Sequence, residues 1–373
     1  MGNVPNLRFP EFSGEWSSQP LTDFMNFKNG LNPDAKRFGR GTKFISVMDI
    51  LNNQYICYDN IRASVELQDG DIETYGVDYG DILFQRSSET LEDVGRANVY
   101  LDSKPAIFGG FVIRGKSKGN YNPLFFRYLL ASPTARKRII VKGAGAQHFN
   151  IGQDGLSKVS LDIPRLSEQE KIGKLLQCVD ARIATQTKII EKLQSLIKGL
   201  TVTLTTVGKP NTTISQCLEC HSSTLQESEV LPNGLCRVFG ANGLVGYKDV
   251  PQMNSDAILV IKDGSGVGTV SYAQGKFSVI GTLNYFTVIG NNDLRYLYFA
   301  LSVFNFQPYK TGMAIPHIYF KDYGKAKIYC PSLAEQKRVA NVLDKLESKL
   351  FVEQELLASF NQQKQYLLGK MFI

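Results

Sequence analysis

The sequence predicts an α+β protein in which two mixed α/β domains are separated by two long helices that pair within the chain. A 20-residue stretch, PRLSEQEKIGKLLQCVDARI (164–183), recurs as PSLAEQKRVANVLDKLESKL (331–350), with 15 of the 20 positions identical or similar. Each copy opens about 40 residues of helical periodicity. Each also follows a segment of short β-type runs between glycine and asparagine turns. A chain repeated in this way has a pseudo-two-fold axis.

The composition is that of a soluble globular protein, with 43% hydrophobic and 21% charged residues over 373 positions. This length suits two domains. No apolar run reaches membrane-spanning length and the N-terminus lacks the features of a signal peptide, so we expect a cytoplasmic protein without a membrane partner. Six irregularly spaced cysteines indicate reduced thiols. The net charge of +7 permits a polyanionic partner without requiring one.

The expected order is a first domain at residues 1–163, a helix at 164–206, a second domain at 207–330 and a helix at 331–373. Pro164 and Pro331 end the strands before the helices, because a prolyl nitrogen cannot donate to a strand ladder. Ser167 has the spacing of a capping-box residue, whereas the second copy lacks that spacing and Ser332 is its expected cap.

Apolar residues recur along both helices at alternating steps of four and three. Such a stripe is too narrow to be buried without a partner, and two stripes of equal length favour pairing within the chain. The alternative is that each helix packs only on its own domain. The residues expected to pair the helices or to dock a subunit are Leu175, Val179, Ile183, Ile190, Leu193, Val342, Leu346, Leu350, Leu357 and Phe360.

The repeat extends beyond the helices. Each domain has one late amphipathic helix (122–139 and 292–306), then a glycine-bearing loop with a histidine, then a last strand. We match residues 80–83 with 256–259, and His148 with His317. The two domains therefore share a frame but differ in surface, which suits the presentation of two recognition surfaces at a fixed spacing to duplex DNA.

Motif searches give no catalytic constellation: the chain has no Walker A sequence, no G-x-S-x-G, no H-E-x-x-H and no methyltransferase tetrapeptide. CLECH (217–221) matches a haem-attachment pattern, and with Cys236 it offers zinc-type ligands, but no second C-x-x-C completes a site and coincidence is favoured. KDGSGVGT (262–269) lacks the ending of a phosphate loop and predicts a hairpin turn. We expect no catalytic residue and no metal site.

The loops carry the candidate DNA-binding residues. Lys and Arg neutralise phosphates, whereas Gln, Ser, Thr and His can contact base edges in a groove. The alternative for any one of these residues is that it only solvates its loop. The candidates are Lys43, Arg86, Ser87, Ser88, Lys142, Gln147, His148, Lys262, Lys310, Thr311, His317 and Tyr319.

Over its whole length the chain resembles the DNA specificity subunit of type I restriction–modification systems. The resemblance is carried by NLRFPEFSGEW near the N-terminus, GDILFQRSSET at 80–90, TGMAIPHIYFKDYGKAKI, and the two P-x-L-x-E-Q helix starts. It implies two target recognition domains, each of which recognises one half of a bipartite, asymmetric DNA sequence. It also implies that the helices pair antiparallel as a coiled coil and set the spacing between the half-sites.

The resemblance further implies a non-catalytic subunit that binds no cofactor itself. Two modification subunits would bring S-adenosylmethionine and methylate adenine, and two restriction subunits would bring ATP- and Mg-dependent translocation and cleavage. One departure is that 207–330 is shorter than 1–163. The alternative function is an orphan or phase-variable DNA-binding protein that lacks an active nuclease partner.

Overall fold

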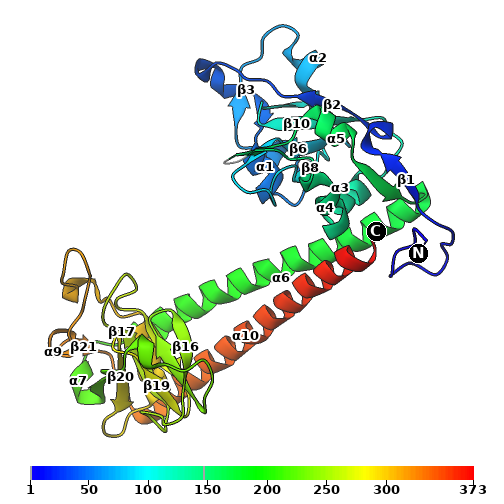
Figure 1. Ribbon diagram of the computed structural model, residues 1–373. Helices are drawn as coiled ribbons and strands as arrows, with labels where there is room; N and C mark the ends of the chain where they lie inside the picture. Colours follow the sequence, from blue (N-terminus) through cyan, green and yellow to red (C-terminus); the bar gives the residue numbers. More distant parts are fainter. Residues whose placement is uncertain (1, 146–147) are drawn as a thin grey trace. The chain divides into compact units, whose positions relative to one another are not determined.

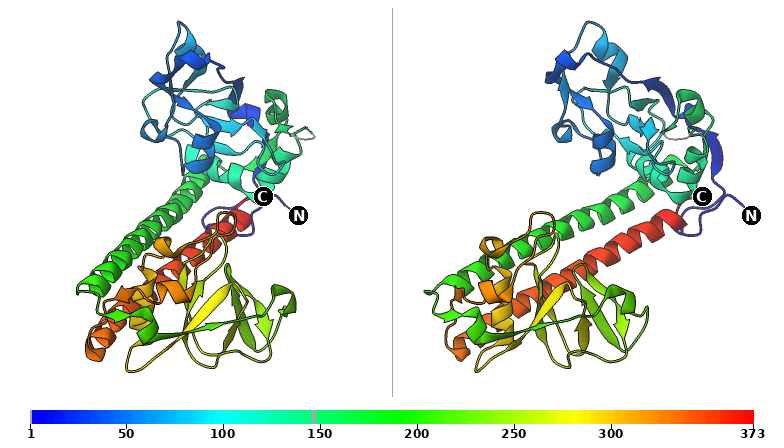
Figure 2. Two further views of the ribbon diagram at one scale, coloured as in Figure 1. Left: turned by 90° about the vertical axis from the view of Figure 1, so that its left-hand side faces the viewer. Right: turned by 60° about the vertical axis from the view of Figure 1, so that its left-hand side comes forward.

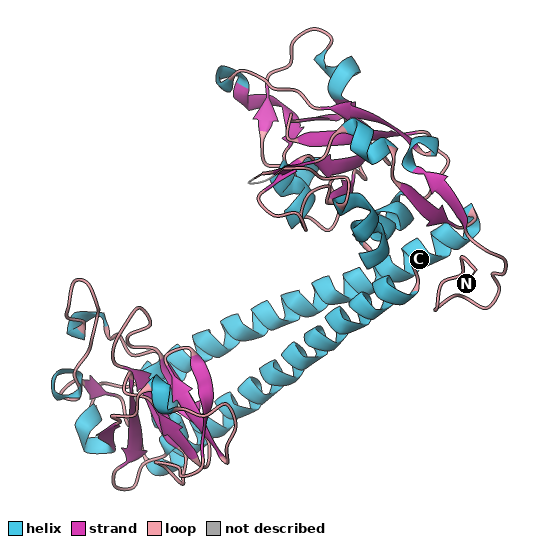
Figure 3. Ribbon diagram, in the orientation of Figure 1, coloured by secondary structure: helices cyan, strands magenta, loops and turns pink. Residues whose placement is uncertain are grey.

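The structure, a computed structural model, describes residues 2–145 and 148–373 and divides the chain into two compact units. Unit 1 comprises Met1–Thr187 and Leu356–Ile373, and unit 2 comprises Lys188–Glu355. Each contains strands, short helices and part of both long helices, α6 (Leu166–Thr206) and α10 (Leu333–Lys370) (Figures 1 and 3). Among the described residues, no helix has the length and apolar character needed to cross a membrane.

Unit 1 is built on two four-stranded sheets, of order β2-β10-β6-β8 and β4-β3-β9-β5, and two strand pairs, β1-β12 and β11-β7. The first sheet is antiparallel throughout, whereas β3 and β9 are parallel neighbours in the second. Its strands are β1 (Ser17–Pro20), β2 (Met25–Asn29), β3 (Phe38–Ile45), β4 (Ser64–Val65), β5 (Gly76–Val77), β6 (Ile82–Gln85), β7 (Ser87–Ser88), β8 (Ala97–Val99), β9 (Ala106–Phe108), β10 (Val112–Ser117), β11 (Phe149–Asn150) and β12 (Ser160–Ile163). Its short helices are α1 (Val47–Asn52), α2 (Asp71–Tyr75), α3 (Pro123–Ala131), α4 (Pro133–Ile140) and α5 (Gln153–Ser157).

Unit 2 has an antiparallel sheet of order β14-β20-β17-β18, a three-stranded sheet of order β16-β15-β19 and the pair β13-β21. Here β15 and β19 are the parallel neighbours. The strands are β13 (Thr212–Thr213), β14 (Leu218–Ser222), β15 (Cys236–Gly240), β16 (Gly243–Lys248), β17 (Ala257–Ile261), β18 (Val270–Ala273), β19 (Phe277–Val279), β20 (Leu283–Val288) and β21 (Lys327–Ile328). The short helices are α7 (Ile214–Cys217), α8 (Leu294–Ser302) and α9 (Phe320–Tyr323).

The two units repeat one topology. In each, the second strand, β2 or β14, lies at the edge of the four-stranded antiparallel sheet. The strands that follow it across the sheet are β10, β6 and β8 in unit 1 and their counterparts β20, β17 and β18 in unit 2. Each also has one parallel strand pair, β3-β9 or β15-β19. In each, the first strand pairs with the last strand before the long helix. The amphipathic helices expected at 122–139 and 292–306 are α3 with α4, and α8.

The long helices pack against each other antiparallel within both units. In unit 1, the start of α6 shares an apolar core with the end of α10, through Ile172, Leu176 and Val179 on one helix and Leu367 and Leu368 on the other. In unit 2, the end of α6 joins the core formed by the start of α10, and Leu200 and Leu204 pack with Val339, Ala340 and Leu343. The predicted pairing of the helices is thus confirmed, but each helix also packs on its domain.

The chain ends meet in unit 1, where the backbone N–H of Leu7 donates to the carbonyl of Lys370 at 2.9 Å (Figures 1 and 2). Arg8 holds the start of α6 with two hydrogen bonds, from Nε to Glu168 Oε1 at 2.8 Å and from Nη2 to Oε2 at 2.7 Å. A hydrogen bond from Trp16 Nε1 to the same carboxylate, at 3.3 Å, completes the anchor. The NLRFPEFSGEW segment therefore ties the N-terminus to the first long helix.

A repeated glutamine explains why the helix start occurs twice. Gln169 donates from Nε2 to the carbonyl of Pro164 at 2.9 Å and accepts from the backbone N–H of Asn122, the N-cap of α3, at 3.0 Å. Gln336 makes the same two contacts, to the carbonyl of Pro331 at 2.9 Å and from the N–H of Asp293, the N-cap of α8, at 2.8 Å. Both side chains are buried. Each glutamine therefore connects three elements by hydrogen bonds: the end of the last strand, the start of the domain helix and the long helix.

Of the two capping residues expected from the sequence, the structure differs at one and agrees at the other. α6 begins at Leu166, so Ser167 lies in its first turn and not at the capping position. In the second copy, Ser332 Oγ accepts from the backbone N–H of Glu335 at 3.4 Å, in the capping place expected for it.

Candidate nucleic-acid interface

The candidate residues gather where the central strand of each main sheet ends. Arg86 follows β6 in unit 1 and Lys262 follows β17 in unit 2. The backbone N–H of Arg86 donates to Phe111 O at 2.9 Å and that of Lys262 to Thr282 O at 3.0 Å. Arg86 also donates from Nη1 to Gly110 O at 3.2 Å. Both cationic residues are partly exposed, so each places a positive charge at the same point of the fold.

The loop that precedes the last strand lies beside this point in both units. The carbonyl of Arg86 accepts from the N–H of Ile151, at 2.9 Å, and that of Lys262 accepts from the N–H of Ile318, at 3.0 Å. One residue earlier in each loop, Asn150 pairs with Ser87 and His317 pairs with Asp263.

This register corrects the sequence match between His148 and His317. The structural counterpart of His317 is Asn150, because both residues close the same bridge, Ala144 with Asn150 and Thr311 with His317. The offset of 167 residues that relates the long helices also relates these positions, and it was the signal that would have found Asn150. His148 is exposed, and its carbonyl accepts from Asn150 Nδ2 at 3.3 Å.

The equivalent positions carry different chemistry in the two units. In unit 1 they hold Arg86, Ser87 and Asn150, where Ser87 Oγ donates to Asn150 Oδ1. In unit 2 they hold Lys262, Asp263 and His317, where His317 Nδ1 lies 3.2 Å from Ile315 O and the ring packs edge-on against Tyr319 with centroids 4.9 Å apart. One frame thus presents two different sets of hydrogen-bonding groups.

The remaining candidates lie at varied distances from these centres. Ser88 belongs to β7, and its Oγ accepts from the N–H of Thr90 at 3.2 Å. Lys43 is half-buried and donates from Nζ to Ile61 O at 2.7 Å. Its ammonium group therefore connects two segments of its own domain. Lys142 is exposed at the start of the unit 1 loop, and Gln147 lies outside the described residues.

In unit 2, the loop from Lys310 to Tyr319 has an exposed apolar tip, with Met313 fully exposed and Ile315 67% exposed. Lys310 is partly exposed, and Thr311 Oγ1 donates to His317 O at 3.3 Å. Beside Asp263 lies a polar cavity of about 360 Å³ that also contacts Asn242, Ser265 and Thr282. These contacts bring the loop, the 262–269 turn and the β15–β16 turn to one end of unit 2.

Each domain helix docks on its long helix through a carboxylate at the repeat offset. In unit 1, Asp180 accepts from Tyr128 Oη at 2.8 Å and from Arg127 Nη1 at 3.2 Å, both on α3. In unit 2, Glu347 accepts from Tyr298 Oη at 3.1 Å and from Arg295 Nη2 at 2.7 Å, both on α8. The same tyrosine–arginine–carboxylate chemistry therefore joins recognition domain and helix in both units.

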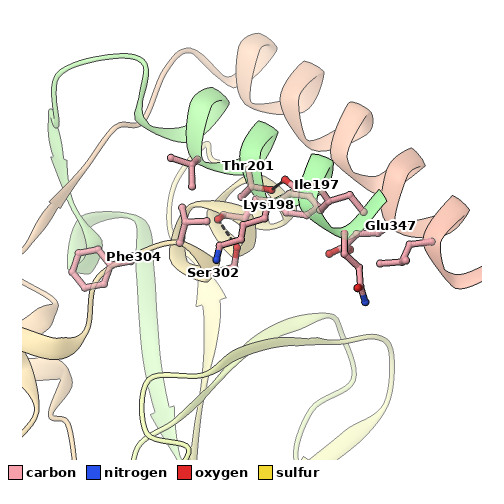
Figure 4. A pocket seen from close by; sticks show the side chains of 11 residues that line it. Ile197, Lys198, Thr201, Ser302, Phe304 and Glu347 are labelled. Atoms are coloured by element: carbon pink, nitrogen blue, oxygen red, sulfur yellow. Dashed lines mark hydrogen bonds between the residues drawn. The ribbon is translucent and has the colours of Figure 1, made fainter. Parts of the chain in front are cut away.

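Close to this joint in unit 2 is a cavity of about 560 Å³ between α6, α8 and α10 (Figure 4). The labelled Ile197, Lys198 and Thr201 come from α6, Ser302 and Phe304 from α8 and the residues after it, and Glu347 from α10. The hydroxyls of Thr201 and Ser302 donate to carbonyls of their own helix, to Ile197 O at 2.7 Å and Phe299 O at 2.8 Å. Both hydroxyls donate within their own helices and not into the cavity. The wall of the cavity is mainly apolar.

Most residues expected to pair the helices are buried or partly buried. Val342 is the exception, at 43% exposure, and the neighbouring Leu343 takes the buried place. The apolar stripe of α10 is shifted by one residue because Val339, Ala340 and Leu343 pack in the core of the unit 2 domain. The other nine are Leu175, Val179, Ile183, Ile190, Leu193, Leu346, Leu350, Leu357 and Phe360. Whether any of them docks a subunit stays a prediction.

The cysteines considered as zinc ligands do not converge. Cys217 Sγ lies 4.0 Å from Cys330 Sγ, His221 Nε2 lies 2.8 Å from Thr287 Oγ1, and Cys236 Sγ lies 3.8 Å from Asp249 O. Within residues 2–145 and 148–373, no group of three or more histidine, cysteine, aspartate or glutamate side chains is placed to hold a metal ion.

Comparison with known proteins agrees with this architecture. The family model described as the type I restriction modification DNA specificity domain matches residues 13–195 and 222–362. A MjaX type I restriction enzyme specificity subunit from Methanocaldococcus jannaschii is 26% identical over 211 residues, which cover 55% of this chain and 49% of the relative. The EcoprrI specificity subunit from Escherichia coli is 24% identical over 123 residues, 33% of this chain and 29% of the relative. The chain thus spans about half the length of the first curated relative and less of the second.

Solved structures share the fold over nearly the whole chain. The S subunit of a type I restriction–modification system from M. genitalium has a TM-score of 0.66 at 17% identity and covers 99% of both chains. A chain from a study of complex assembly and conformational transition of the type I R-M system has a TM-score of 0.60 at 13% identity, and covers 95% of this chain and 96% of its own. With the family model matching most of both units, the chain belongs to the type I restriction modification DNA specificity family.

Proposed function

We propose that the chain is the non-catalytic specificity subunit of a type I restriction–modification complex and that it recognises a bipartite, asymmetric DNA sequence in the cytoplasm. Unit 1 would recognise one half-site and unit 2 the other. The observation that carries this proposal is the repeated frame with different side chains: Arg86, Ser87 and Asn150 in unit 1 and Lys262, Asp263 and His317 in unit 2. Two units with the same backbone frame can be placed equivalently on DNA. Different polar side chains at the equivalent positions can form hydrogen bonds with different bases.

The partners in this proposal are duplex DNA, two modification subunits and two restriction subunits. The repeated joints at Asp180 and Glu347 support two-fold recruitment, because each unit presents the same arrangement of domain helix and long helix. S-adenosylmethionine, ATP and Mg would be held by the partner subunits. This chain would contribute DNA recognition and a scaffold.

The test is genome-wide mapping of N6-methyladenine in a host with and without the gene, and with two variants of it. We expect a split motif to lose methylation on deletion. Asp263→Ser, which gives unit 2 the side chain found at that place in unit 1, should change or relax one half-site and leave the other as it was. Asp249→Asn, an exposed carboxylate elsewhere in unit 2, is the matched control and should leave the motif intact.

A motif that survives deletion would contradict the proposed function. Changes in both half-sites for Asp263→Ser would show that the two units do not recognise their half-sites independently. Methylation of a split motif without restriction of unmodified DNA would assign the chain to a system that lacks an active nuclease.

A further inference from the structure

A cationic pocket in unit 1 lies apart from the loop centre around Arg86. Its volume is about 520 Å³, and its walls come from α1, the 92–98 segment, α3, α4 and the end of α10. Five cationic side chains line it and one acidic side chain, Glu92, lies with them. The cationic residues are Arg96, Arg127, Arg136, Lys137 and Lys364.

Two of these cations share one carboxylate. Asp180 accepts from Arg127 at 3.2 Å and forms an ion pair with Lys364 at 2.7 Å. On the other side of the pocket, Arg96 forms an exposed ion pair with Asp93 at 2.7 Å. Lys137 is exposed, and no ion pair of its ammonium group is found among the described residues. The three cations Arg96, Arg136 and Lys137 thus face the two carboxylates of Asp93 and Glu92, so this side keeps a net positive charge.

Arg136 contributes a fixed positive charge to this side of the pocket. Its Nη2 donates to Val94 O at 2.6 Å and to Glu92 O at 2.8 Å, which fixes the guanidinium in place. Its Nη1 is buried and has no hydrogen-bond partner among the described residues. Burial first, and then the charge of Arg96, lowers the pKa of Arg136 to about 10, although Asp93 partly opposes this. Because Nη1 is buried, Arg136 acts on a ligand through its charge, and an anion in the pocket would offset the two neighbouring guanidinium charges.

We propose that this pocket binds a phosphate group of the DNA backbone, with the exposed Arg96 and Lys137 as its ligands and the half-buried Arg136 adding its charge; the inference rests on the function proposed above. Ile50, Leu51 and Ile140 form an apolar wall of the same pocket. A phosphodiester matches both features, because its charged oxygens are flanked by the carbon faces of two deoxyriboses.

The pocket is also joined to the loop centre by backbone hydrogen bonds. The N–H of Gln85, one residue before Arg86, donates to Arg96 O at 2.7 Å, and the N–H of Gly95 donates to Gln85 O at 2.9 Å. Gln85 and Arg96 are thus the two ends of one short segment that contains Arg86 and Ser87. A phosphate held by Arg96 would fix the position of the backbone relative to Arg86 and Ser87 without adding sequence information.

The experiment measures the affinity of the full chain for a duplex that contains the methylated motif, as a function of KCl concentration. The pocket variant is Arg96→Gln with Lys137→Gln, two exposed residues whose loss should not disturb the core. The control is Lys104→Gln with Lys158→Gln, which removes the same charge from exposed positions of unit 1 outside the pocket. We leave Arg136 in place in this variant because it anchors the 92–94 segment, and test it separately as Arg136→Lys.

We expect the slope of log affinity against log salt to fall by about 1 to 2 for the pocket variant, since each lost phosphate contact removes about 0.9. The control should keep the wild-type slope, Arg136→Lys should weaken binding, and the methylated motif should be the same for all. An equal slope for pocket variant and wild type overturns the inference, even where the pocket binds free AMP or an acidic partner protein. A changed motif also overturns it, because the residues would then contact bases. Wild-type protein that binds no DNA would instead contradict the proposed function.

Discussion

Asp180 is the residue on which most contacts of the unit 1 joint depend. It is 5% exposed and accepts from Tyr128, Arg127 and Lys364, which belong to α3 and α10. Burial by itself would raise the pKa of this carboxyl, but Lys364, Tyr128 and Arg127 together hold the pKa below its ordinary value. The folded state therefore favours the ionised form, and the carboxylate stabilises unit 1 wherever it is ionised.

Asp180→Asn should destabilise unit 1 by about 2 to 3 kcal/mol at pH 7, because the half-buried Arg127 and Lys364 lose their counter-charge. The folded pKa lies below the unfolded value of about 3.9, so the contribution is fully present above that pH and is lost as pH falls through the folded pKa. Urea unfolding at several pH values between 7 and 3 should show the difference between variant and wild type shrinking at the acidic end. The exposed Asp154→Asn is the control, and a pH-independent difference would contradict this account.

At the scale of elements, the buried glutamines Gln169 and Gln336 determine how a recognition domain joins its helix. Each satisfies the carbonyl of the proline that follows the last strand and the N–H of the residue that caps the domain helix. Both glutamines are at most 3% exposed. The glutamine recurs in both copies of the helix start because the same joint has to be made twice.

Replacing either glutamine with alanine should leave two backbone groups, at least one of them only partly buried, without their partners, at a cost of about 1 to 3 kcal/mol. The loss should be local. Hydrogen exchange should rise in α3 for Gln169→Ala and in α8 for Gln336→Ala, and not in the other domain helix. The exposed Gln177→Ala and Gln354→Ala are matched controls. Equal exchange in variants and wild type would show that the glutamines are not needed for the joint.

At the scale of the whole molecule, both long helices pass from one unit to the other, at residues 187–188 and 355–356. An insertion at these two places leaves the joints of both units untouched. If the helices set the spacing between half-sites, as the family resemblance implies, lengthening both of them should lengthen the gap in the recognised DNA.

Seven residues inserted after Thr187 and seven after Glu355 preserve the heptad and add about 10 Å to each helix. At 3.4 Å per base pair, the gap should grow by about three base pairs. Methylation mapping should find the two half-sites unchanged around the longer gap. The same seven residues inserted after Asn233, in an exposed loop of unit 2, are the control. A gap of unchanged length would show that the helices do not set the spacing.

The sequence by itself determined the features that rest on local pattern. The internal repeat, the two long helices and the basic and polar loops after β6 and β17 all follow from periodicity and composition along the chain. Because an apolar stripe every three to four residues needs a partner whatever the rest of the fold, the pairing of the helices was predictable as well.

Only the tertiary structure decided which residues are equivalent and which come together. Asn150, not His148, corresponds to His317: the 167-residue offset of the long helices points to Asn150, but only strand pairing shows that this offset persists through loops that have diverged in sequence. Leu343 is buried in place of Val342 because α10 packs on a domain as well as on α6. The pocket of Arg96 and Arg136 is lined by residues as distant in the chain as Ile50 and Lys364. Its charge results from which cations have found a carboxylate, and that depends on packing in three dimensions rather than on spacing along the chain.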